Sequence, residues 1–418
     1  MNHPQQLVEH YCRHESARLV ATLAGRFGVR HLDLIEDVVQ GAFIRALRSW
    51  PLSGVPKEPR AWLYRVAFNA AMDHLRRDMR WNPLSAADEK ADTSFSADHN
   101  TISDYEVSDS QLRMIFACCS DEIPRESQVA LALKTLCGFG NREIARALLS
   151  SEASVAKKLV RAKQKLRTLG FDPYQLTPAD IRSRLPTVQA VAYLLFNEGY
   201  YSSGERSLVR EELCEEAVRL ALILAEHPIT KGDRSSALIA LMLFHASRLE
   251  ARLDESGLML QLHEQDRQRW DYRMIREAGR WMTMACGEEL SRYHVEAWIA
   301  SEHCVATSYE TTNWNRIAAA YAMLQSFDSS PTVQMNRAIA VSYAEGIAAG
   351  WRLLRRIPDD FQSTSALWAS AAADFSMREK QNGQALEYLE KAIQLATSES
   401  ERAFLRRMIG RVRDQTTL

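Results

Sequence analysis

Apolar residues recur at intervals of three and four along most of the chain, and this spacing limits the possible folds more than any other feature. One segment carries them at Val155, Leu159, Ala162, Leu166 and Leu169. Because an α-helix turns once every 3.6 residues, this spacing gives a helix one apolar face. Among 418 residues glycine (17) and proline (12) are scarce, and alternating strand patterns are hard to find. The sequence therefore predicts an all-α protein.

Breaks in the helical pattern divide the chain into four parts. A first helical domain is expected over residues 1–80, with helices near 3–25, 32–48 and 60–79; the prolines and glycine of 50–59 are expected to exclude helix. Residues 81–110 are polar and acidic, which is typical of a linker. A second helical domain is expected over 111–170 and a C-terminal helical-repeat domain over 180–418. In that last part the pattern Gly383, Ala385, Tyr388, Ala392 resembles a tetratricopeptide unit.

Charge is distributed unevenly among these parts, although the whole chain has a net charge of only −1. Residues 1–80 carry a net +4, 81–120 carry −5, 121–170 carry +5 and 171–418 carry −5. Basic domains attract polyanions because neutralising phosphates releases bound counterions. Two basic domains joined by an acidic segment therefore indicate nucleic-acid binding, which the average charge conceals.

Sequence motifs of enzymes are missing. There is no phosphate-binding loop, zinc-protease helix, serine-hydrolase elbow or calcium loop, and Gly138-Phe139-Gly140 is read as a turn between helices. The seven cysteines form no C-x-x-C pair, which favours a reducing compartment and argues against zinc; Cys118-Cys119 is expected in the core. No apolar run approaches the roughly 18 residues of a membrane span, and the N-terminus lacks a signal peptide. We expect a cytoplasmic protein without membrane contact, metal, cofactor or catalytic activity.

Residues 141–167 have the layout of a helix-turn-helix. Ile144 and Ala145 lie on a short first helix, Ser150-Ser151-Glu152 provides a capping turn, and the next helix buries the apolar face described above. Its other faces are strongly basic. The residues expected to face DNA are Ser154, Lys157, Lys158, Arg161 and Lys163. The alternative is a solvated helix with a basic face and no ligand.

Residues 60–77 interleave aromatic side chains with arginine, asparagine and histidine. Aromatic rings beside cations suit unstacked bases, for which stacking contributes about 1–3 kcal/mol per base. For any single ring, including that of Trp62, packing in the core is the alternative.

The chain resembles a bacterial extracytoplasmic-function (ECF) sigma factor of RNA polymerase in the order of its segments. These segments are residues 37–47, residues 62–77, an acidic linker and a helix-turn-helix. Residues 192–200 and 265–271 resemble the subgroup with a long C-terminal tetratricopeptide-like extension. The resemblance covers most of the chain.

The resemblance implies an alternative sigma factor that initiates transcription, with core RNA polymerase (its β and β′ subunits) and promoter DNA as partners. Residues 1–80 would be sigma region 2 and 111–170 sigma region 4. Contacts with core polymerase are expected from Asp37, Gln40 and Phe43. The −10 element would be held by Trp62, Arg65, Asn69, Arg76 and Arg77, and the −35 element by the helix-turn-helix residues named above. The acidic linker would occupy the polymerase's RNA channel, and the C-terminal domain would regulate the factor in cis.

Two other functions remain open from the sequence: a stand-alone helix-turn-helix regulator with a helical sensor domain, and a protein-interaction scaffold. In the C-terminal half, residues 196–200 and 266–271 are candidates for binding an unknown protein or small molecule. Their alternative role is structural, as helix ends and buried ion pairs that hold helical hairpins together.

Overall fold

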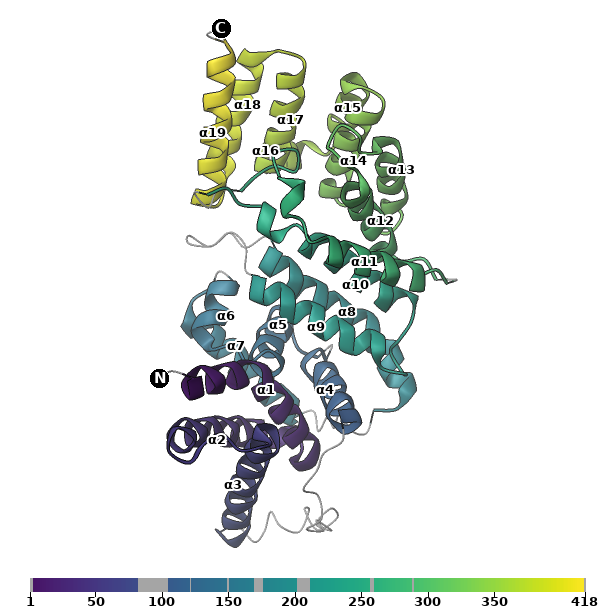
Figure 1. The fold of residues 1–418 in the computed structure, drawn as a ribbon. Helices are drawn as coiled ribbons and strands as arrows, with labels where there is room; N and C mark the ends of the chain where they lie inside the picture. Colours follow the sequence, from purple (N-terminus) through teal and green to yellow (C-terminus); the bar gives the residue numbers. More distant parts are fainter. Residues whose placement is uncertain are drawn as a thin grey trace. The chain divides into compact units, whose positions relative to one another are not determined.

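The computed structural model describes residues 3–81, 104–120, 122–148, 150–168, 176–200, 211–255, 259–287 and 289–416. All regular elements in these ranges are helices (Figure 1), and the one strand-like feature is an isolated bridge between Leu253 and Met259. The prediction of an all-α protein is confirmed. The chain forms two compact units, Met1–Val191 with Glu226–Thr230, and Ala192–Ala225 with Lys231–Leu418.

The first unit begins with three helices that pack against one another: α1 (His3–Phe27), α2 (Leu32–Ser53) and α3 (Pro59–Trp81). Their apolar faces bury Leu23, Ile35 and Leu63 completely. Aromatic pairs join the helices, with ring centroids 5.3 Å apart for Phe27 and Phe68. This packing places the outer faces of α2 and α3 next to each other.

Helix α2 extends further than the sequence predicts, through Pro51 to Ser53. Proline costs a helix one backbone hydrogen bond and is disfavoured in helix interiors, but Pro51 lies in the last turn, where little helix remains to be disrupted. The helix ends at Gly54, whose φ of 82° lies in the left-handed region and whose N–H bonds to the carbonyl of Trp50 at 3.0 Å. The expected break is therefore shorter, and Pro59 begins α3.

The helices α4 (Asp104–Cys118), α5 (Arg125–Leu136), α6 (Asn141–Ala147) and α7 (Glu152–Thr168) follow, with α1 packed against α4 and α5. Helix α4 begins earlier than predicted, inside the expected linker; the part of that linker from 82 to 103 lies outside the described residues. Cys118 and Cys119 are buried in the core, as predicted, and burial raises the pKa of the Cys118 thiol. The Gly138–Gly140 segment connects α5 to α6 and is a turn, again as predicted.

Helix α8 (Pro178–Tyr200) begins in the first unit and ends in the second. The rest of the second unit is a succession of helices. The helices are α9 (Glu211–Glu226), α10 (Asp233–Ala246), α11 (Tyr272–Met284), α12 (Arg292–Val305), α13 (Trp314–Leu324), α14 (Pro331–Ala344), α15 (Ile347–Leu354), α16 (Asp359–Thr364), α17 (Ala366–Arg378), α18 (Asn382–Leu395) and α19 (Glu399–Thr416). From α12 to α15, and again from α17 to α19, each helix packs on the next (Figure 1). Such stacking of neighbours is typical of helical repeats.

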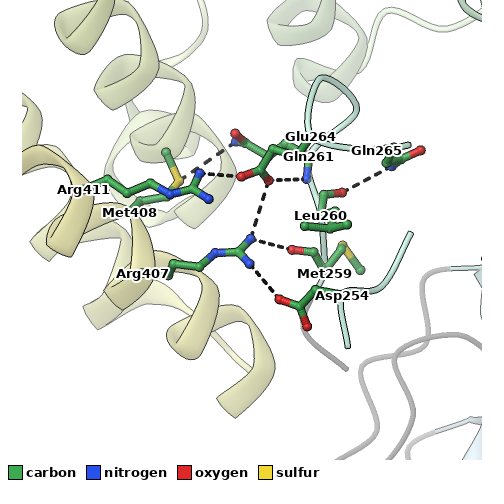
Figure 2. Close-up of polar contacts among 9 residues, drawn as sticks. All are labelled: Asp254, Met259, Leu260, Gln261, Glu264, Gln265, Arg407, Met408 and Arg411. Atoms are coloured by element: carbon green, nitrogen blue, oxygen red, sulfur yellow. Dashed lines mark hydrogen bonds and ion pairs between the residues drawn. The ribbon is translucent and has the colours of Figure 1, made fainter. Parts of the chain in front are cut away.

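The C-terminal helix is tied to a segment about 150 residues earlier in the sequence (Figure 2). Arg407 of α19 pairs with Asp254 at 3.1 Å and donates a hydrogen bond to the carbonyl of Met259 at 2.8 Å. Glu264 accepts from Arg411 and lies 3.5 Å from the Arg407 guanidinium. These contacts anchor α19 within the second unit in addition to its apolar face.

Close packing of α14 and α15 gives a testable difference between two helical glycines. A Cβ on Gly350 would lie 2.5 Å from Cβ of Ser342 and 3.0 Å from the carbonyl oxygen of Ala338. Gly350→Ala is therefore expected to lower the unfolding free energy of the second unit by about 1–3 kcal/mol. Gly279→Ala in α11, where a Cβ meets nothing within 4 Å, is expected to raise it by up to about 1 kcal/mol. Calorimetric melting of both variants measures the difference, and equal effects of the two substitutions would contradict the packing argument.

Candidate nucleic-acid interface

A groove of about 650 Å³ runs between α2 and α3 on the first unit. Four of the five residues predicted for the −10 element line it: Trp62, Arg65, Asn69 and Arg77. Their spacing on α3 follows the helical repeat of three and four, with one longer step of eight, which places them on one face. The fifth, Arg76, is exposed but does not line the groove.

A half-buried aromatic ring and exposed polar side chains both line this groove. Trp62 is half-buried and packs edge-on against the fully buried Trp50, with ring centroids 5.6 Å apart, so its ring is held in place. Arg65 and Asn69 are exposed beside it. A fixed aromatic ring next to cations and an amide is suited to holding an unstacked base and its phosphate.

Helix α2 adds cations to the groove that the sequence prediction did not include. Arg45 and Arg48, one helical turn apart, line it together with His74 of α3. Their signal in the sequence was their spacing of three, which places both arginines on one face of the helix. The groove thus has cationic side chains on both walls.

The three residues predicted to contact core polymerase have different environments on α2. Asp37 is exposed and lines the same groove, and Gln40 is exposed beside it. Phe43 is only 3% exposed and belongs to the core, so its side chain supports the helix and offers no surface to a partner in this conformation. Exposed apolar residues missed from the sequence, Ile44 at 44% and Leu47 at 41%, follow Gln40 at helical spacing.

The helix-turn-helix predicted from the sequence is formed by α6 and α7, which pack against each other and against α5. The hydroxyl of Ser151 accepts a hydrogen bond from the N–H of Ser154 at 3.2 Å and so caps α7. The buried residues of α7 are Val155, Leu159, Ala162 and Leu166, as the spacing predicts. This arrangement directs the opposite, basic face of α7 outward.

The cations on α7 differ in their partners. Lys157 and Arg161 are exposed, and in the described ranges neither has a carboxylate partner. Lys158 donates to Glu126 at 2.6 Å, and this hydrogen bond and charge hold the pKa of Glu126 below its usual value. Lys163 is paired with carboxylates on α2. The predicted DNA-facing set therefore contains two exposed cations and two that are already paired, beside the half-buried Ser154.

The C-terminal segments singled out in the sequence have structural roles. Asp271 accepts hydrogen bonds from the N–H groups of Arg273 and Met274 and so caps α11. Arg267 donates to the carbonyls of His303 and Ala306, at 2.7 and 2.6 Å, at the end of α12. Tyr200 is buried and stacks on Phe196, with centroids 5.7 Å apart. These contacts agree with the structural alternative for both segments.

Comparison with known proteins bears on the groove and the helix-turn-helix directly. The sigma-70 region 2 family matches residues 13–80, which contain the groove, and the sigma-70 region 4 family matches residues 113–166, which contain α6 and most of α7. The chain thus contains a sigma-70 region 2 domain and a sigma-70 region 4 domain. A family of unknown function, DUF6596, matches residues 184–286 in the extension that follows the sigma domains.

Two relatives show how far these similarities extend. An uncharacterized protein of Rhizobium meliloti (strain 1021) is 35% identical over 387 residues, which cover 90% of this chain and 89% of that protein, so both belong to one family. The ECF RNA polymerase sigma-E factor of Escherichia coli (strain K12) is 29% identical over 134 residues, or 31% of this chain and 70% of that factor. No solved structure matches. Similarity to the ECF factor therefore covers about a third of this chain, whereas similarity to the Rhizobium protein covers nine-tenths of it. Among the helices that the structure describes, none is long and apolar enough to cross a membrane.

Proposed function

We propose that this protein is an ECF-type sigma factor that binds core RNA polymerase, recognises −10 and −35 promoter elements and starts transcription without catalysis of its own. The observation that carries the proposal is the presence, in one chain, of a cation-lined groove in sigma region 2 and an exposed basic helix in sigma region 4. Neither feature alone requires a promoter, but together they provide two separate DNA-reading surfaces.

In region 2, Trp62, Arg65, Asn69 and Arg77 would hold the −10 strand, with Arg45 and Arg48 on the opposite wall of the groove. Region 2 would dock on the β′ subunit of core polymerase through the exposed residues of α2, with Asp37 and Gln40 as the first candidates. In region 4, Lys157 and Arg161 would make the first contacts with the −35 duplex, because both are exposed. Region 4 would contact the β subunit, and residues 81–110 would link the two domains through the polymerase.

The second unit would act as a tetratricopeptide-like regulatory domain in cis. Its support is the stacking of consecutive helices from α12 to α15 and from α17 to α19. Helical repeats bury their cores between neighbours and leave an extended surface for a protein or small-molecule partner. On this proposal a chain shortened to residues 1–172 transcribes at a level different from that of the full chain, and equal levels would contradict regulation in cis.

Transcription reconstituted from purified components tests the proposal. Full-length protein, core polymerase and a pool of genomic fragments are expected to give transcripts with defined start sites, and core polymerase alone is expected to give none. A stand-alone helix-turn-helix regulator would instead bind a specific duplex tightly without polymerase. Absence of any sigma-dependent transcript across the fragment pool would reject the proposed function.

A further inference from the structure

A pair of carboxylates on α2 holds the C-terminal half of α7, within the first unit. Nζ of Lys163 lies 2.9 Å from Oδ1 of Asp33 and 2.7 Å from Oε2 of Glu36, and the Lys163 side chain is only 12% exposed. Arg167 also pairs with Asp33. Two adjacent cations of region 4 are therefore bound to two adjacent acids of region 2.

The two helices are matched in spacing as well as in charge. Asp33 and Glu36 are three residues apart at the start of α2, and Lys163 and Arg167 are four apart on α7, so each pair lies on one helical face. Packing of α1 against α4 and α5 keeps the two domains side by side in this conformation. The junction itself is not closely packed, because a pocket of about 380 Å³ lies there, lined by Asp33, Lys163 and Arg167 among others. The side chains of Asp33 and Arg167, which are 53% and 42% exposed, are thus open to exchange with other ions.

The other ion pairs of α7 do not link the two domains. Lys158 pairs with Glu126 and Lys165 pairs with Glu122, and both acids belong to region 4 itself. These pairs persist however region 4 moves. The pairs with Asp33 and Glu36 break as soon as region 4 leaves region 2.

We infer that Asp33 and Glu36 form an intramolecular docking surface for α7, on which their carboxylates take the positions of DNA phosphates. The inference rests on the proposed function, since it assigns α7 to duplex DNA. While α7 is docked, Lys163 and Arg167 are not available to a duplex, and DNA has to displace the carboxylates. Elements named −10 and −35 are about 25 base pairs apart, or about 85 Å at 3.4 Å per base pair, so this contact opens when both domains are on one promoter.

Zero-length carbodiimide cross-linking of the full chain tests whether the contact exists in solution. This reagent joins an amine to a carboxylate only when the two are in direct contact. We expect a cross-linked peptide that contains Lys163 and either Asp33 or Glu36, and we expect duplex DNA in excess to reduce it. Failure to detect this peptide at low salt, where the Lys158–Glu126 cross-link serves as internal control, would overturn the inference.

Duplex binding tests the competition. The test variant carries Asp33→Asn together with Glu36→Gln on α2. Its control carries Glu387→Gln together with Glu390→Gln, which make the same charge change on the exposed face of α18. For a labelled 25-base-pair duplex of mixed sequence, we expect the α2 variant to bind about tenfold tighter than this control at 0.1 M salt. Its log–log salt slope is expected to steepen by about 2, since each added phosphate contact contributes about 0.9.

The outcomes separate this inference from the proposed function. Equal affinities of the α2 variant and the α18 control mean that the carboxylates do not compete with DNA, and the inference is then wrong. Tighter duplex binding by the α2 variant, together with no transcription on adding core polymerase, supports the docking surface and rejects the sigma-factor proposal.

Discussion

Replacing both Arg65 and Arg77 by alanine is expected to reduce transcription from a cognate promoter by about a hundredfold. Both side chains line the groove between α2 and α3. A hydrogen bond to a charged group contributes about 1.5–3 kcal/mol, and each 1.4 kcal/mol is a factor of ten, so loss of two phosphate contacts accounts for the effect. Reconstituted transcription with core polymerase measures it.

The control for this experiment is Arg276→Ala with Arg352→Ala, which removes two exposed arginines from the second unit and changes the net charge equally. It is expected to transcribe at a level close to the wild-type level. Because Arg65 and Arg77 are exposed, circular dichroism of the groove variant is expected to show unchanged helix content. Wild-type transcription by the groove variant would mean that this groove does not hold the promoter.

Replacing Lys157 and Arg161 by alanine is expected to weaken binding to a short duplex by about tenfold and to lower its salt slope by about 2. These are the exposed cations of α7 for which the described residues provide no carboxylate partner, so both can reach phosphates without breaking an ion pair. Fluorescence anisotropy at several salt concentrations measures the affinity and the slope together.

The same Arg276→Ala with Arg352→Ala variant controls for the loss of two positive charges elsewhere. A protein-interaction scaffold, whose basic helix is only a solvated face, predicts an unchanged slope for the α7 variant. Such a result would remove α7 from the DNA-binding surface.

Local spacing accounts for the successful structural predictions. The buried face of α7 and the turn at Gly138–Gly140 were predicted correctly because helical repeats and turn residues act over a few neighbouring positions. The predictions failed at element ends. Helix α2 continues through Pro51, and α4 begins at Asp104 within a segment whose composition is that of a linker. End positions depend on packing against other helices, which composition does not report.

Helical spacing also explains why the residues of the groove were predicted only in part. Trp62, Arg65, Asn69 and Arg77 share one face of α3, and a helical repeat is sufficient to find them together. Arg45 and Arg48 were missed because they belong to another helix, and only the packing of α2 on α3 brings them to the same groove. Phe43 was chosen from the resemblance, and its burial is decided by that same packing.

By itself the sequence determined the helical class, the apolar face of each helix and which side chains on α7 are cationic. Only the tertiary structure decided which of those cations are exposed and which are paired. Lys157 and Lys163 look alike in the sequence, yet Lys163 pairs with Asp33 and Glu36, which lie about 130 residues earlier in the chain. The physical reason is range: helical periodicity relates residues within a few turns, whereas an ion pair depends on how separate helices pack.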